Sequence, residues 1–143
     1  MLLADLTKGF ACGLGGLIVG GAPVGELCAL AAIVGQIAPV FAGFRGGKGA
    51  ATTLGGYIAV APALAVIGLA SWGLGLLVLR RGVLSTVSAI VALALVSILL
   101  GEHVAFGIGA AIIALVAHRN DLAAWRRGEM PTIRESLRDN RRV

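Results

Sequence analysis

The stretch VLSTVSAIVALALVSILL, residues 83–100, decides the fold class of this chain. It contains eighteen residues and no charge. As an α-helix rising about 1.5 Å per residue it is about 27 Å long, which is close to the roughly 30 Å hydrocarbon core of a bilayer. An uncharged apolar run of this length is typical of a membrane-spanning helix.

The composition extends this prediction to most of the chain. Of its 143 residues, 58% are hydrophobic and 13% are charged, whereas a soluble domain carries roughly a quarter charged residues. The net charge of +5 does not indicate a nucleic-acid partner, because no soluble domain carries it. Lys and Arg beside membrane helices instead set orientation and contact anionic membrane lipids. Cys12 and Cys28 lie in apolar runs, so we expect neither a metal site nor a disulfide.

Turn and charged residues divide the rest of the chain into further apolar elements. Residues 50–79 carry no charge, yet a single helix of that length is about 45 Å long and exceeds one crossing. Pro62 lies inside the run and predicts a break between a short, shielded element and a longer one. We therefore predict an all-α, polytopic membrane helical bundle with five or six membrane elements, one of them short or broken near Pro62. The predicted elements are residues 10–21 (with 2–8 as a possible extension), 27–41, 50–60, 63–79, 83–100 and 104–116.

The basic residues agree with this division into crossings. If residues 50–79 cross twice, every Lys and Arg falls on one side of the membrane, and the opposite turns hold Glu26, Glu102 and His103. Positive charge of this kind marks the cytoplasmic side. We expect a membrane helical domain over residues 1–118 and a cytoplasmic basic tail over residues 119–143, in a bacterial inner membrane.

A glycine-rich basic loop, Gly46-Gly47-Lys48-Gly49, carries the strongest chemical signal. Its glycines leave backbone N–H groups free to turn toward an anion, and a helix starting after Gly49 adds its own N-terminal N–H groups. Arg45 and Lys48 supply positive charge, and Thr52 supplies a hydroxyl. The loop predicts a phosphate site at the membrane surface. The alternative is a flexible basic loop that only sets topology.

The surrounding stretch GQIAPVFAGFRGGKGAAT, residues 35–52, resembles the second signature of the bacterial acyl-phosphate:glycerol-3-phosphate acyltransferases. That signature reads roughly G-H-x-x-P-V-F-x-x-F-x-G-G-K-G-x-A-T, and its His is replaced here by Gln36. Residues 5–9 resemble the family's D-x-x-K-G run, and residues 85–88 its S-L-A-S run. The third signature, roughly R-H-x-x-N-I-x-R-L-x-x-G-x-E, matches at His118 and Gly128. Its Asn position holds Asp121 and its second Arg position holds Ala124.

The resemblance implies acyl transfer from an acyl-phosphate to glycerol 3-phosphate, giving lysophosphatidic acid, without a cofactor or a metal. We expect catalytic roles for Lys48 and for His118, which acts as a base or hydrogen-bonds the hydroxyl. The expected site residues fall into two groups. Those that bind phosphate are Arg45, Gly46, Gly47, Lys48, Gly49 and Thr52, and those that line the site are Gln36, Ser85 and Ser88.

Two other interpretations stay open. One is an inactive relative that binds anionic lipid or lipid phosphate, which the replacement of the family's His by Gln36 favours. The other is a small transporter. The sequence places no ionisable residue at mid-membrane depth, where coupled transporters usually have one, and this argues against a transporter. Family members begin with another helix and a first signature resembling S-G-N-P-G-A-T-N, which does not occur after Met1. We expect weak or no activity unless residues upstream of Met1 are restored.

Overall fold

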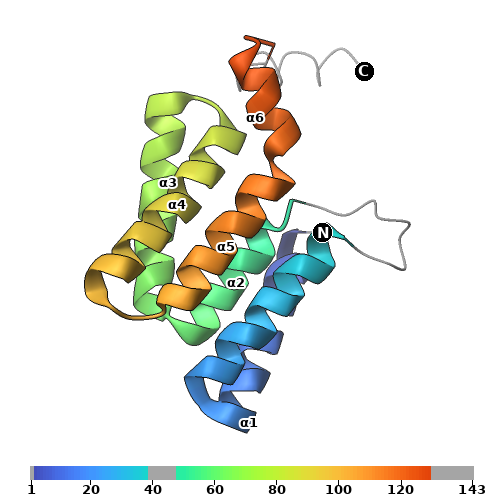
Figure 1. Ribbon diagram of the computed structural model, residues 1–143, viewed down its shortest axis with the longest axis vertical. Coiled ribbons are helices and arrows are strands. Elements are labelled where there is room, and N and C mark those ends of the chain that lie inside the picture. The colour runs from blue at the N-terminus through green and yellow to red at the C-terminus, as the bar shows by residue number, and fades with distance from the viewer. Residues whose placement is uncertain (1, 39–47, 130–143) are drawn as a thin grey trace.

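The computed structural model describes residues 2–38 and 48–129, and these residues form a bundle of six α-helices (Figure 1). The predicted all-α class is confirmed. Three helices are long and apolar enough to cross a membrane, and the bent pair α5–α6 makes a fourth candidate. In chain order the helices are α1 Leu2–Ile37, α2 Ala50–Val60, α3 Pro62–Leu79, α4 Gly82–Leu100, α5 Val104–Ala117 and α6 Arg119–Arg126.

Helix α1 is a hairpin of two helical halves (Figure 1). Gly20 and Gly21 leave helical geometry, and Gly21 has φ +72°, a conformation that glycine adopts without strain. The halves pack closely, since a Cβ atom on Gly16 would lie 2.7 Å from the carbonyl oxygen of Val24. The predicted pair of elements and the turn between them are therefore present. The first half also includes the extension toward Leu2.

The break predicted near Pro62 is confirmed. Ala61 leaves helical geometry at φ −149° and ψ 69°, and Pro62 opens α3, where its missing N–H breaks no helical hydrogen bond. Helix α2 has eleven residues, so it is about 16 Å long and too short to cross a bilayer alone. It is enclosed by other helices, as expected for such an element.

Helix α2 meets α1 with almost no space between their backbones. A Cβ atom on Gly9 would collide with the carbonyl oxygen of Thr52, and one on Gly55 would collide with the carbonyl oxygen of Leu6. Small residues at such crossings let membrane helices approach and gain dispersion contacts. The close approach fixes α2 against the first half of α1.

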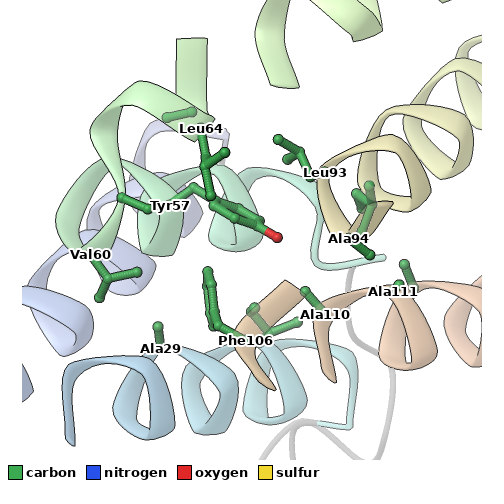
Figure 2. Close-up of a cluster of buried hydrophobic side chains, with 14 residues drawn as sticks. Ala29, Tyr57, Val60, Leu64, Leu93, Ala94, Phe106, Ala110 and Ala111 are labelled. Atoms are coloured by element: carbon green, nitrogen blue, oxygen red, sulfur yellow. The ribbon is translucent and has the colours of Figure 1, made fainter. Parts of the chain in front are cut away.

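The centre of the bundle is built around an aromatic pair. The rings of Tyr57 on α2 and Phe106 on α5 meet edge to face, with centroids 4.6 Å apart, and both side chains are fully buried. Figure 2 shows Ala29, Leu64 and Ala110 among the labelled residues of this cluster. Large apolar side chains also cover the outside, as in proteins whose exterior faces lipid.

The ends of the bundle differ in charge. The turns within α1, between α2 and α3, and between α4 and α5 lie toward one end, whereas the α3–α4 turn and α6 lie toward the other (Figure 1). Arg80 and Arg81 lie in the α3–α4 turn, so residues 50–79 do run along the bundle twice. Glu26 and His103 meet at the opposite end, with Nδ1 and Oε1 2.7 Å apart. This arrangement agrees with the one-sided charge expected from the sequence.

The glycine contact between α1 and α2 gives a stability prediction. Gly9→Ala should destabilise the protein by about 1–3 kcal/mol, because the added methyl group meets backbone that has no rotamer to change. The matched control is Gly15→Ala on the same helix, where a Cβ atom has nothing within 4 Å. Unfolding of both variants in detergent is the measurement. Equal stability of the two variants would contradict the packing described.

Candidate functional site

An ion pair joins the glycine-rich loop to the tail of the bundle. Nζ of Lys48 lies 2.7 Å from Oδ2 of Asp121 on α6, and the two side chains are 50% and 27% exposed. Lys48 was predicted as the main charge of a phosphate site. Asp121 was noted only as a departure from a signature, and its contact with Lys48 was not foreseen.

Gly49 connects Lys48 to the start of α2. It adopts φ +74° at the N-cap position, and its carbonyl oxygen accepts a hydrogen bond of 2.8 Å from Oγ1 of Thr53. A side chain at Gly49 would be strained by this backbone conformation and would also press on Ile37. The helix does start directly after Gly49, so its first N–H groups, which have no helical partner, lie beside Lys48.

Other residues of the predicted phosphate loop are distributed differently. Arg45, Gly46 and Gly47 lie outside the described residues, and their roles stay predictions. Thr52 is fully buried, and its backbone faces Gly9 of α1. Its Oγ1 has no hydrogen-bond partner among the described residues. The predicted hydroxyl contribution to phosphate binding also stays a prediction.

His118 lies at the bend of 61° between α5 and α6. Its side chain is 2% exposed, and Nδ1 lies 2.9 Å from the carbonyl oxygen of Ala114. Because a carbonyl only accepts, Nδ1 is the donor in this hydrogen bond, and Nε2 is the ring nitrogen that takes no part in it. The carbonyl of His118 begins α6 by accepting the N–H of Leu122 at 2.9 Å. His118 therefore lies one helical turn before Asp121, and hence close in sequence to the residue that contacts Lys48.

The three predicted lining residues have partners of their own. Oε1 of Gln36 accepts a hydrogen bond of 3.2 Å from Nζ of Lys8. This bond joins the motif of residues 5–9, in the first half of α1, to the motif of residues 35–52, which begins in the second half. Ser85 donates to the carbonyl of Arg81 at 2.9 Å, and Ser88 donates to the carbonyl of Ser85 at 3.0 Å. Both serine hydroxyls are thus hydrogen-bonded within α4, and the lining role of all three residues stays a prediction.

An apolar groove begins at the first turn of α2. Its volume is about 330 Å³, and it extends from Ala50 at the start of α2 to Tyr57, which is about 10 Å along the helix. Trp72 and Thr86 join across its wall through a hydrogen bond of 3.2 Å between Nε1 and Oγ1. Its lining comes from four helices and is almost entirely apolar: Leu2, Leu6, Ala50, Ala51, Thr53, Leu54, Tyr57, Gly68, Leu69, Trp72, Thr86, Ala89, Ile90 and Leu93.

Sequence reasoning missed Asp121 and the groove for different reasons. Asp121 carried a usable signal, since it is an acidic residue three positions after His118 in a motif that pointed to a basic site. The groove carried none, because each of its walls reads as an ordinary apolar helix. The structure thus joins Lys48, at the N-terminus of α2 and the start of the apolar groove, to Asp121, three positions after His118.

Known proteins share both the sequence and the fold. A family model described as glycerol-3-phosphate acyltransferase matches residues 1–128. Glycerol-3-phosphate acyltransferase of Thioalkalivibrio sulfidiphilus is 36% identical, over 99% of this chain and 72% of its own. Glycerol-3-phosphate acyltransferase 1 of Moorella thermoacetica is 41% identical, over 80% of this chain and 60% of its own. That of Synechococcus elongatus is 36% identical, over 79% of this chain and 55% of its own.

A solved structure agrees with these relatives. The glycerol 3-phosphate form of PlsY (YgiH), an integral membrane glycerol 3-phosphate acyltransferase, superposes with a TM-score of 0.87 at 28% identity. The match covers 92% of this chain and 68% of that one. The chain thus spans between about half and three quarters of the length of these relatives. It is a multi-pass membrane protein and belongs to the glycerol-3-phosphate acyltransferase family.

Proposed function

We propose that this protein transfers an acyl group from an acyl-phosphate to the 1-hydroxyl of glycerol 3-phosphate, giving lysophosphatidic acid for phospholipid biosynthesis. The observation that carries the proposal is that a basic site and an apolar groove adjoin at the start of α2. Lys48 and the N-terminus of α2 offer positive charge and N–H donors at the point where the apolar groove begins. Phosphate chemistry and acyl-chain burial are therefore available within one turn of helix.

The relatives support the same substrates. The matched PlsY structures are a glycerol 3-phosphate form and a lysophosphatidic acid form, which correspond to the proposed acceptor and product. The acyl chain would lie in the groove, where its burial from water is favourable. Both phosphate groups would lie at the basic end. No cofactor is required, because an acyl-phosphate already contains a good leaving group.

The proposed transfer is a direct substitution at the acyl carbon. The 1-hydroxyl oxygen of glycerol 3-phosphate attacks the acyl carbonyl carbon, and the bond from that carbon to the phosphate oxygen breaks. The hydroxyl proton passes to Nε2 of His118 and from there to the departing phosphate. Lys48 and the α2 N–H groups offset the repulsion between the two phosphate groups, so that much of the rate enhancement comes from positioning and charge stabilisation.

An inactive relative that binds anionic lipid or lipid phosphate is the second candidate. The observation in its favour is that Lys48 already has a carboxylate partner, and that Gln36 stands where the signature has an imidazole. Gln36 can donate a hydrogen bond but cannot exchange a proton near neutral pH. Acyl transfer assays with purified protein separate the two candidates.

We further propose that the basic end of the bundle and residues 119–143 lie in the cytoplasm of a bacterium, with residues 1–118 in its inner membrane. The support is the one-sided distribution of Lys and Arg together with α6, in which no residue is buried. Reporter fusions after Val143 and at Glu102 should then report opposite sides of the membrane. Two fusions on the same side would contradict the proposed topology.

Lys48→Ala should weaken the binding of glycerol 3-phosphate about tenfold to a hundredfold. The loss of one hydrogen bond to a charged group is worth about 1.5–3 kcal/mol, and Asp121 would remain as an unpaired negative charge. Lys48→Arg should restore only part of the affinity, because a planar guanidinium does not replace a compact ammonium beside Gly49. Calorimetry measures both variants. Unchanged binding in Lys48→Ala would leave the loop a topology signal only.

Filling the mouth of the groove should impair the use of the lipid substrate alone. Ala51→Phe should raise the KM for a long-chain acyl-phosphate about tenfold or more, while the affinity for glycerol 3-phosphate stays within about twofold. The matched control is Ala70→Phe on α3, which adds the same ring at an exposed position outside the groove. Steady-state kinetics with both substrates varied is the measurement. An equal effect of the two variants would remove the groove from the proposal.

A further inference from the structure

We infer that Asp121 is a built-in competitor for the phosphate site, and that displacement of its carboxylate from Lys48 releases α6 from the bundle. The inference rests on the proposed function in one respect, which is that phosphate binds at Lys48. It adds a residue that sets the affinity of that site and a movement that accompanies binding.

The contact itself is the first argument. The carboxylate lies 2.7 Å from the ammonium, so it occupies one of the three N–H donors that Lys48 can offer to a phosphate oxygen. A phosphate in contact with the ammonium would bring two negative groups within a few ångströms of each other. Like charges at this distance repel, and an incompletely exposed site screens them less than bulk water does. The carboxylate must therefore move away when the phosphate arrives.

The weak attachment of α6 is the second argument. None of its residues is buried, and it leaves α5 at a bend of 61°. Arg127 is paired with Glu129 at 2.8 Å, but both belong to the segment that follows α6. Among the ion pairs of residues 2–38 and 48–129, the Lys48–Asp121 pair is the one that links α6 to another part of the bundle. Loss of this pair leaves α6 with the hydrogen bonds that join it to the end of α5, such as that from Arg119 to the carbonyl of Val116 at 3.4 Å.

The two events are linked in both directions. If phosphate binding and the docking of α6 exclude each other, the docked state of α6 lowers the affinity for phosphate by a certain factor. Bound phosphate then lowers the docking equilibrium of α6 by the same factor. Partly exposed ion pairs contribute a factor of about two to five. The repulsion between carboxylate and phosphate acts in the same direction. An Asn at position 121, as in the signature that the sequence resembles, has the same shape but no charge to compete.

Asp121→Asn in the full-length protein tests the inference. The protein is held in a neutral detergent free of phospholipid, so that glycerol 3-phosphate is the only phosphate present, and binding is measured by calorimetry. We expect Asp121→Asn to bind about fivefold more tightly than the wild type. Glu129→Gln is the matched control, since it removes one negative charge just after α6 at a residue that pairs with Arg127 and not with Lys48, and it should change the affinity by less than twofold. In a Lys48→Ala background, Asp121→Asn should gain less than it does beside an intact Lys48, because no pair is left to break.

Hydrogen exchange on α6 provides the second readout. Saturating glycerol 3-phosphate should speed the exchange of the α6 amides in the wild type, and Asp121→Asn should show the faster exchange without ligand. Helix content by circular dichroism checks that the variant folds, and Asp121→Ala serves as a second variant with the same expected direction.

The outcomes separate the inference from the function on which it rests. Affinity in Asp121→Asn that is equal to or weaker than that of the wild type would overturn the competition and leave the phosphate site standing. Unchanged α6 exchange on binding would overturn the release of α6. Absence of glycerol 3-phosphate binding in the wild type and in every variant would overturn the phosphate site together with the inference.

Discussion

The fold depends on enclosing one helix that is too short for the membrane. Helix α2 is about 16 Å long, so its ends would leave backbone groups in hydrocarbon if it stood alone, at a cost of several kcal/mol for each unpaired group. The bundle meets this constraint with glycine. Gly9 and Gly55 allow the backbones of α1 and α2 to touch, and Phe106 covers the opposite side through its contact with Tyr57.

This enclosure also explains where the site lies. Helix α2 begins at Ala50, directly after Gly49, which has a left-handed backbone conformation. Lys48 is thereby held at the boundary between the apolar groove and α6. A helix long enough to cross the whole bilayer would instead have its N-terminus at the membrane surface, beyond the apolar region. The N-terminus of α2, the proposed phosphate site, thus lies where the apolar groove begins.

Local features of the sequence predicted most of the fold, and distant contacts account for the rest. Pro62 predicts the α2–α3 break because a proline in a helix interior costs a hydrogen bond. The uncharged run of residues 50–79 likewise predicts an element that begins after Gly49. The pair between Lys48 and Asp121 joins residues 73 positions apart, so the motif around Asp121 indicates a basic partner but does not specify which one. Gln36 was recognised as a departure from a signature, but its bond to Lys8 depends on the closure of the α1 hairpin.

The two ends of the bundle are held together in different ways, and the difference suits the proposed chemistry. At the end away from the site, short turns join consecutive helices, and Glu26 and His103 tie the α1 hairpin to the α4–α5 turn through a pair that is mostly shielded, at 16% and 21% exposure. At the basic end, half of the Lys48 side chain is exposed, so solvent weakens that pair more than the shielded one. Contacts with a small opening free energy are expected where substrates must enter, because the segments that move on binding are those of low local stability. A bundle held in this way can therefore keep α2 fixed while the contact of α6 with Lys48 opens to a ligand.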